Sequence, residues 1–359
     1  MDRKTIAIDL AKDVFELAID GGSAIERQRL TRTKFQQFAA HLPPSRIVME
    51  ACGSANHWAR WFIARGHEVL MLPAQHVKAY RRGNKTDRGD ALALLQADRV
   101  ADITPVPVKS IEQQNLQHLH RLREQWKRTR VARINALRGI LREHGHAFPA
   151  ATDTFLANAM ETVEADPALA MLRPALHALQ AEITFLEDQM ADIERQLRTL
   201  TRHNPEVQAL QAIAGIGLLT ATATVAAVGT PHHFRNGRQF SAWLGITPRE
   251  NSSGNRRSLG SITRRGNVYL RTLFIHGARS ALLSAKRTAK MNPDKLTRLQ
   301  RWALDLEQRV GHNKAAVGLA NKMARIAWAV WHHAREFDGN WQPAPLAARQ
   351  PVHQLGGML

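Results

Sequence analysis

The chain has 359 residues, more than one ordinary core requires, and this length indicates two or three domains. Lys and Arg total 50 against 31 Asp and Glu, and the resulting formal net charge of +19 is self-repulsive unless a polyanion such as nucleic acid neutralises it. The single cysteine, Cys52, excludes a disulfide framework and a cysteine-based zinc site, and it fits a cytoplasmic protein.

Residues 1–108 alternate short apolar runs with helical segments. The runs TIAIDLA, FELAID, RIVME and HEVLML are typical of β-strands, and an amphipathic segment lies around Trp58 to Ile63. The later segment TDRGDALALLQADRV predicts a helix opened by Asp87. The pattern predicts an α/β domain.

Residues 109–204 have the pattern of long helices. Apolar residues alternate three and four positions apart, which predicts a coiled-coil seam: Leu176, Leu179, Ile183, Leu186, Met190, Ile193, Leu197 and Leu200. The preceding helix is strongly basic, and such a face is either merely solvated or in contact with phosphates. Its candidate nucleic-acid-binding residues are Arg121, Arg123, Lys127, Arg128, Arg130 and Arg133.

Residues 205–345 predict a compact, mainly helical domain, and residues 346–359 a loose tail. Ala212 to Gly229 is uncharged for 18 residues, but three Gly and three Thr make it too weakly hydrophobic for the membrane span its length allows. We expect no membrane association.

An arginine-rich stretch containing one acid, Glu250, follows, and its density of guanidinium groups indicates phosphate contact. Its candidate residues are Arg249, Arg256, Arg257, Arg264, Arg265 and Arg271.

Four acids stand at the ends of predicted elements. Asp9 and Glu50 end strands, and Asp87 and Asp90 open a helix. Singly, each has an ordinary role as a turn former, an exposed carboxylate or a helix cap. In a ribonuclease-H-like sheet, however, these ends meet at one edge, where converging carboxylates repel one another unless divalent cations lie between them. Two ions about 3.5–4 Å apart would clamp a scissile phosphate, and oxygen ligands select Mg²⁺ or Mn²⁺ over zinc.

A second motif, Ser252-Ser253-Gly254-Asn255, lies within the arginine-rich stretch. Taken alone it predicts a turn. A serine nucleophile needs activation, and the local sequence offers no base.

The complete pattern resembles the DEDD insertion-sequence transposases, which include Piv-like invertases and bridge-RNA-guided recombinases. The resemblance covers roughly residues 1–335 and is carried by the four acids, the coiled-coil middle, GIG, LGITP, SSG and ITRRGNVYLR, in this order. It implies a RuvC-like catalytic domain at 1–108, a helical coiled-coil domain at 109–204 and a C-terminal transposase domain at 205–345.

The resemblance also implies roles for individual residues. Asp9, Glu50, Asp87 and Asp90 would hold magnesium, and Ser253, with Ser252 as the alternative register, would attack the DNA phosphate to form a phosphoserine link. The family further implies a noncoding guide RNA that reads sequence by base pairing, and a homo-oligomer, dimer or tetramer, for which the coiled-coil seam is an independent reason.

Other functions remain open on sequence alone. A RuvC-like nuclease or junction resolvase would use the acids and water without a serine. A tyrosine recombinase would use Tyr269, near the arginines, but would leave the acids without a role. A non-enzymatic coiled-coil nucleic-acid-binding protein would need neither the acids nor a nucleophile.

Overall fold

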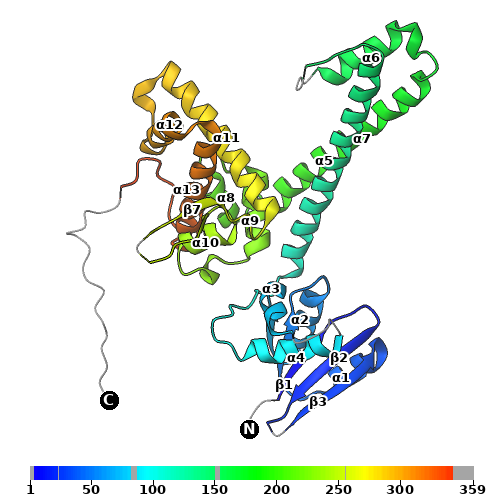
Figure 1. Ribbon diagram of the computed structural model, residues 1–359, viewed down its shortest axis with the longest axis vertical. Coiled ribbons are helices and arrows are strands. Elements are labelled where there is room, and N and C mark those ends of the chain that lie inside the picture. The colour runs from blue at the N-terminus through cyan, green and yellow to red at the C-terminus, as the bar shows by residue number, and fades with distance from the viewer. Residues whose placement is uncertain (1–3, 23, 82–86, 150–153, 255, 343–359) are drawn as a thin grey trace. The chain divides into compact units, whose positions relative to one another are not determined.

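The computed structural model describes residues 4–22, 24–81, 87–149, 154–254 and 256–342 (Figure 1). The side chains of residues 87 and 88 lie outside the description, although their backbone is helical. The contacts divide the chain into two compact units, Met1–Gln114 and Asn115–Leu359.

The first unit contains a five-stranded mixed sheet in the order β3-β2-β1-β4-β5. β1 pairs antiparallel with β2 and parallel with β4, while β2–β3 is antiparallel and β4–β5 parallel. Its elements are β1 (Thr5–Asp9), β2 (Val14–Asp20), β3 (Ile25–Thr31), α1 (Arg32–Ala40), β4 (Arg46–Glu50), α2 (Ala55–Ile63), β5 (Glu68–Leu72), α3 (Ala74–Val77), η1 (Lys78–Tyr80) and α4 (Asp87–Asp98).

Side-chain alternation gives this sheet two different faces. Ile6 and Ile8 of β1 lie in one core cluster with Phe35 of α1 and Trp58 of α2. Ala7, between them in sequence, lies on the opposite face in a cluster with Ala91, Leu94 and Leu95 of α4. The small side chains on this face allow α4 to pack against β1, and α4 carries Asp90 with it.

The second unit begins with a helical hairpin. α5 (Ile111–Glu143) runs antiparallel to α7 (Arg173–Leu200), and the two are joined through α6 (Phe155–Ala165) and η2 (Pro167–Leu169). Three ion pairs fix the direction, since partner numbers fall along α7 as they rise along α5: Arg123–Glu194 at 2.6 Å, Arg130–Glu187 at 2.5 Å and Arg133–Glu182 at 2.7 Å.

The apolar seam of α7 packs within the same chain. Ile183 and Leu197 are completely buried, and Leu197 lies in one cluster with Leu116 of α5 and Ala226 of α9. At the far end Leu176 packs with Leu137 and Leu141 of α5. Most of the predicted seam is therefore packed, much of it against α5 of the same chain, but Leu200 at its end is 61% exposed.

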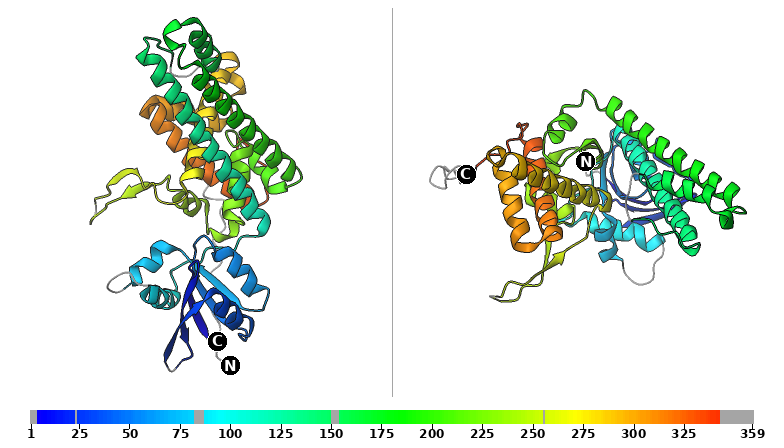
Figure 2. Two further views of the ribbon diagram at one scale, coloured as in Figure 1. Left: turned by 90° about the vertical axis from the view of Figure 1, so that its right-hand side faces the viewer. Right: turned by 90° about the horizontal axis from the view of Figure 1, so that it is seen from above.

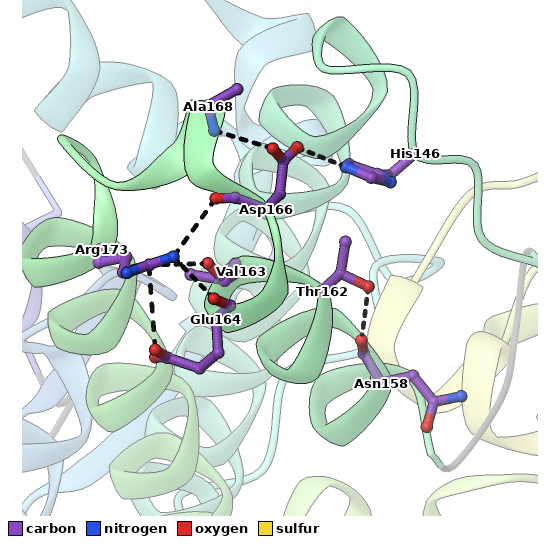
Figure 3. A network of polar contacts seen from close by, with 8 residues as sticks. All are labelled: His146, Asn158, Thr162, Val163, Glu164, Asp166, Ala168 and Arg173. Carbon is purple, nitrogen blue, oxygen red and sulfur yellow. Dashed lines mark hydrogen bonds and ion pairs between the residues drawn. The ribbon is translucent and has the colours of Figure 1, made fainter.

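Arg173 closes the tip of this hairpin (Figure 3). Its guanidinium donates to the carbonyl oxygens of Val163 (3.0 Å) and Glu164 (2.7 Å) in the last turn of α6. It also donates at 3.4 Å to the Asp166 oxygen, which accepts from the Leu169 amide at 3.1 Å. The Asp166 carboxylate accepts from the Ala168 amide at 2.8 Å and lies 2.8 Å from His146 Nε2. These contacts fix the turn between the helices.

The rest of the second unit is mainly helical. Phe240, Leu270, Phe274, Leu319 and Met323 contribute to one large core formed by its helices. The elements are α8 (Pro205–Gln211), α9 (Leu218–Val228), η3 (Pro231–His233), α10 (Gly237–Trp243), β6 (Pro248–Glu250), β7 (Leu259–Ile262), α11 (Val268–Met291), η4 (Pro293–Lys295), α12 (Arg298–Val310) and α13 (His312–His332).

The GIG segment has a packing role. A Cβ at Gly215 would lie 2.5 Å from the Gly277 carbonyl oxygen of α11, and one at Gly277 would lie 2.0 Å from the Gly215 oxygen. Two glycines are therefore needed for the backbones to approach. Most of the uncharged stretch that contains Gly215 forms α9, which is largely buried. Among the described residues, no helix is long and apolar enough to cross a membrane.

The predicted fold is confirmed. An α/β N-terminal unit of ribonuclease-H-like topology is followed by long helices and a mainly helical C-terminal region. The division of residues 109–345 into separate coiled-coil and transposase domains, followed by a tail from 346, stays a prediction.

Candidate active site

All four acids stand on β1, β4 and α4, the elements that meet on one face of the sheet, although the Asp87 side chain lies outside the description. β1 and β4 are parallel, with Ile8 opposite Met49, so Asp9 and Glu50 end neighbouring strands at the same edge. Both continue the alternation of Ala7 and Val48, which face α4. Asp90 lies in the first turn of α4 and is 6% exposed.

Arg81 joins two of these acids. Its Nε lies 2.6 Å from Asp90 Oδ1 in an ion pair, and its Nη2 donates to Glu50 Oε2 at 3.4 Å. The Asp90 side chain is 9% exposed, and the Arg81 and Glu50 side chains are both 23% exposed. A shielded cation therefore lies between the two carboxylates and reduces the repulsion that their approach would otherwise cause.

The donor chemistry at this edge suits a hard divalent cation. Glu50 and Asp90 supply carboxylate oxygens, which are the ligands that hard divalent cations prefer. Among the side chains that the structure describes, no three His, Cys, Asp or Glu residues form a metal-binding group. The Asp87 side chain lies outside the described residues. The structure thus brings Glu50 and Asp90 to one guanidinium and places Asp9 at the adjacent strand end.

The candidate nucleophile lies on a projecting β-hairpin. β6 and β7 pair antiparallel and extend away from the neighbouring helices of the second unit (Figure 2). Ser253 lies toward the tip, where its amide and carbonyl bond with those of Arg256 at 3.2 and 3.1 Å. Its side chain is exposed and has no hydrogen-bond partner among the described residues.

The hydroxyl of the neighbouring Ser252 is hydrogen-bonded within the hairpin. Ser252 Oγ donates to Glu250 Oε1 at 2.8 Å and accepts from the Ser258 amide at 3.2 Å. Glu250, the only carboxylate of the hairpin, also lies 3.2 Å from Arg257 Nε. Of the two serines in the SSG motif, Ser253 therefore has the hydroxyl without a described partner, and the one carboxylate of the hairpin is already engaged.

Two glycines fix the base of the hairpin. A Cβ at Gly245 would lie 1.8 Å from the Arg265 carbonyl oxygen, and one at Gly266 would lie 1.8 Å from that of Trp243. Both have positive φ, +73° and +90°. Arg271 Nη1 donates across the junction to the Leu244 and Arg265 oxygens at 3.2 and 3.3 Å. The LGITP and RRGN segments therefore interlock, and the arm begins from a rigid base.

The six candidate arginines of this region differ in availability. Arg257 is paired with Glu250, and Arg271 is used at the hairpin base. The other four are exposed and form no ion pair with a described carboxylate: Arg249, Arg256, Arg264 and Arg265.

The basic helix α5 is divided in the same way. Arg123, Arg130 and Arg133 form ion pairs with glutamates of α7. The list of candidate arginines, made from sequence, could not take these pairs into account. Arg121 is exposed, Lys127 and Arg128 lie near Glu124, and Arg121 and Arg128 line a cleft of about 630 Å³ beside α9 and α11. Arg121 thus forms no ion pair with a described carboxylate, whereas Lys127 and Arg128 pair with Glu124 at 3.9 and 3.4 Å.

Tyr269 is held in a buried hydrogen-bond chain. Thr222 Oγ1 donates to the Leu218 carbonyl at 2.7 Å, so it accepts from His120 Nε2 at 3.0 Å. His120 Nδ1 then accepts from the Tyr269 hydroxyl at 3.0 Å. Burial lowers the pKa of His120 to about 4 and raises the pKa of Tyr269 to about 12. A phenol held neutral beside so weak a base is poorly suited to nucleophilic attack.

The lowered pKa of His120 should make the free energy of unfolding depend on pH. Its folded pKa lies below the unfolded value near 6.5, so its contribution is complete above pH 6.5 and is lost as pH falls to about 4. The native state should lose about 3 kcal/mol of unfolding free energy from this group over that window. Denaturant unfolding at a series of pH values measures it. His120→Gln should flatten the slope, whereas His118→Gln, an exposed neighbour on α5, should retain it; equal slopes for wild type and His120→Gln would contradict this assignment.

Sequence patterns do not single out Arg81, His120 or Thr222. Arg81 precedes the acidic helix in AYRRGNKTDRGD, and an arginine between candidate acids is the only signal it gives. His120 and Thr222 are 102 residues apart, and only the packing of α5 against α9 brings them together.

Comparisons with known proteins agree with this architecture. A model described as "Transposase IS116/IS110/IS902 family" matches residues 207–292, and a second, described as "Transposase" and named for the DEDD transposases of IS110, matches residues 6–146. A probable family 20 transposase from Pseudomonas aeruginosa is 41% identical over 92% of this chain and 97% of its own length.

Two further relatives are transposases of named insertion sequences. The IS1111A transposase from Coxiella burnetii is 39% identical over 92% of this chain and 90% of its own length, and the IS1328 transposase from Yersinia enterocolitica is 32% identical over 90% and 96%. With its DEDD sheet, long helices and helical C-terminal region, the chain belongs to the IS116/IS110/IS902 family of transposases, enzymes that cut DNA.

Proposed function

We propose that this transposase cuts and rejoins DNA strands with Ser253 as nucleophile and with Asp9, Glu50, Asp87 and Asp90 as ligands of Mg²⁺ or Mn²⁺. The convergence of Glu50 and Asp90 on Arg81, beside the strand that Asp9 ends, carries the proposal. Shielded carboxylates that share one cationic partner at a sheet edge are frequent at functional sites.

Ser253 would attack the scissile phosphorus with its exposed hydroxyl. The phosphodiester bond to the leaving oxygen breaks as the bond to Ser253 Oγ forms, so the energy of the phosphodiester is kept for rejoining. Because the hairpin has no free carboxylate, activation of the hydroxyl must come from outside it. A bound divalent ion would supply this activation and stabilise charge on the phosphate oxygens.

The cations of the second unit would hold the nucleic-acid backbone. Arg249, Arg256, Arg264 and Arg265 surround the hairpin without carboxylate partners, and they would neutralise phosphates next to Ser253. A structured noncoding RNA of the element would read the target by base pairing, and the protein would then need only backbone contacts.

We also propose a homo-oligomer, dimer or tetramer, through the helical hairpin. Because α5 fills much of the α7 seam, the contact would have to use apolar side chains that this pairing leaves outside. Leu122, Val131 and Phe185 are 45%, 44% and 58% exposed. A second copy that covers them would remove this apolar surface from water.

The proposal is tested by a strand-exchange assay with the full chain, DNA carrying the element junction, target DNA and the noncoding RNA transcribed from the element. Rejoined strands are expected only when both the RNA and Mg²⁺ or Mn²⁺ are present. Cleaved but unjoined strands would instead identify a RuvC-like nuclease that uses water. Nucleic-acid binding with neither product under any condition would identify a non-enzymatic binding protein.

A further inference from the structure

A cavity of about 510 Å³ lies in the C-terminal helical region, and neither the four acids nor Ser253 line it. α12, the second half of α13 and the segment after α13 line it. Trp302 and Phe337 are partly buried, while Trp341 at the edge is 62% exposed. An exposed indole that lines a cavity can contact a planar ligand that enters it.

Three cations of α12 and α13 line the same cavity, and Arg335, after α13, lines it as well. Arg298 lies at the start of α12, and Lys322 and Arg325 lie on α13. None of the three forms an ion pair with a described carboxylate, although Glu336 and Asp338 also line the cavity. Lys322 Nζ instead lies 3.8 Å from the centre of the Trp302 ring.

Burial and neighbouring cations disfavour the charged forms of Lys322 and Arg325. Partial burial, together with Arg325 and Arg298, lowers the pKa of Lys322. Burial and Arg238 lower the pKa of Arg325. Cations that repel one another in a partly desolvated place are stabilised by an anion that enters it.

We propose that this cavity binds one unpaired nucleotide of a single strand, with its base on Trp341 and its phosphate between Arg298, Lys322 and Arg325. The volume is within the range of small-molecule pockets, and an aromatic face beside clustered cations is the combination that single-strand binders use. A duplex would not enter, because its bases are already stacked and paired.

The proposal extends the proposed function without depending on the Ser253 chemistry, since binding is measured without strand cleavage. Single-stranded RNA and single-stranded DNA offer the same chemistry, a stackable base joined to a phosphate. Which of the two occupies the cavity is therefore left to the arms of the experiment.

The test uses the full chain and single-stranded hexanucleotides that contain one 2-aminopurine. Stacking on an indole should quench the fluorescence of this base on binding. Trp341→Ala should abolish the quenching and lower affinity by about tenfold, and Trp341→Phe should restore part of both. Because Trp341 is exposed, these variants should fold normally.

The cations provide a second readout. Lys322→Gln and Arg325→Gln should each reduce the dependence of log affinity on log salt by about one. Lys290→Gln on α11, outside the cavity, is the matched control and should leave the quenching unchanged.

Tighter binding of the RNA hexamer would identify RNA as the natural strand, and equal or tighter binding of the DNA hexamer would identify a DNA strand; both support the pocket. Equal quenching by a duplex, or quenching that survives Trp341→Ala, would overturn the proposal. Because no strand is cut, failure of strand exchange with intact quenching would count against the proposed function alone.

Discussion

Replacing Ser253 with alanine should lower the yield of rejoined DNA by at least about a thousandfold, because the proposed reaction has no other covalent carrier of the strand. The side chain is exposed near the hairpin tip and makes no hydrogen bond with a described residue, so its removal should leave the fold intact. Strand exchange measured alongside thermal unfolding separates loss of chemistry from loss of structure.

Ser252→Ala is the matched control. Its hydroxyl bonds with Glu250 and the Ser258 amide, so the substitution should loosen the hairpin and reduce activity by no more than about tenfold. If Ser252→Ala is inactive and Ser253→Ala active, the nucleophile is in the alternative register. Cleavage that survives both changes would favour attack by water.

Glu50→Gln and Asp90→Asn should each lower strand exchange by at least about a thousandfold. Each amide is nearly isosteric with the acid but lacks the charge that a divalent ion and Arg81 require. The same variants should lose the rise in unfolding temperature that Mg²⁺ or Mn²⁺ gives to wild type, since an ion that binds only the native state stabilises it.

Asp98→Asn is the control for loss of a shielded ion pair. Asp98 ends α4, is 10% exposed at its side chain and pairs with Arg46 at 2.9 Å, which matches the burial of Asp90 away from the proposed site. It should lower stability while retaining the metal-induced shift and strand exchange. Full activity in Asp90→Asn would exclude this carboxylate from the chemistry.

The sequence predicted the α/β unit well because β-strands alternate faces. The alternation of Ile6, Ala7 and Ile8 shows which face of β1 carries large side chains and which carries small ones. The strand-end positions of Asp9 and Glu50 follow from the same register. The topology then brings these acids to one edge.

Other contacts depend on pairings that no local pattern specifies. The α7 heptads predict a partner helix but not which one, and the structure supplies α5. Arg123 and Arg130 thus appear in sequence as free cations and in the structure as partners of Glu194 and Glu187. The Gly245 interlock is equally non-local, since its close contact is with Arg265.

The most direct measurement traps the protein–DNA adduct on a substrate that is cut but cannot rejoin, and maps the linked residue by peptide mass spectrometry. We predict a phosphodiester link to Ser253 that forms in wild type with Mg²⁺ or Mn²⁺ and is absent in Asp90→Asn. An adduct on Tyr269, or efficient strand exchange through no covalent protein link, would contradict it.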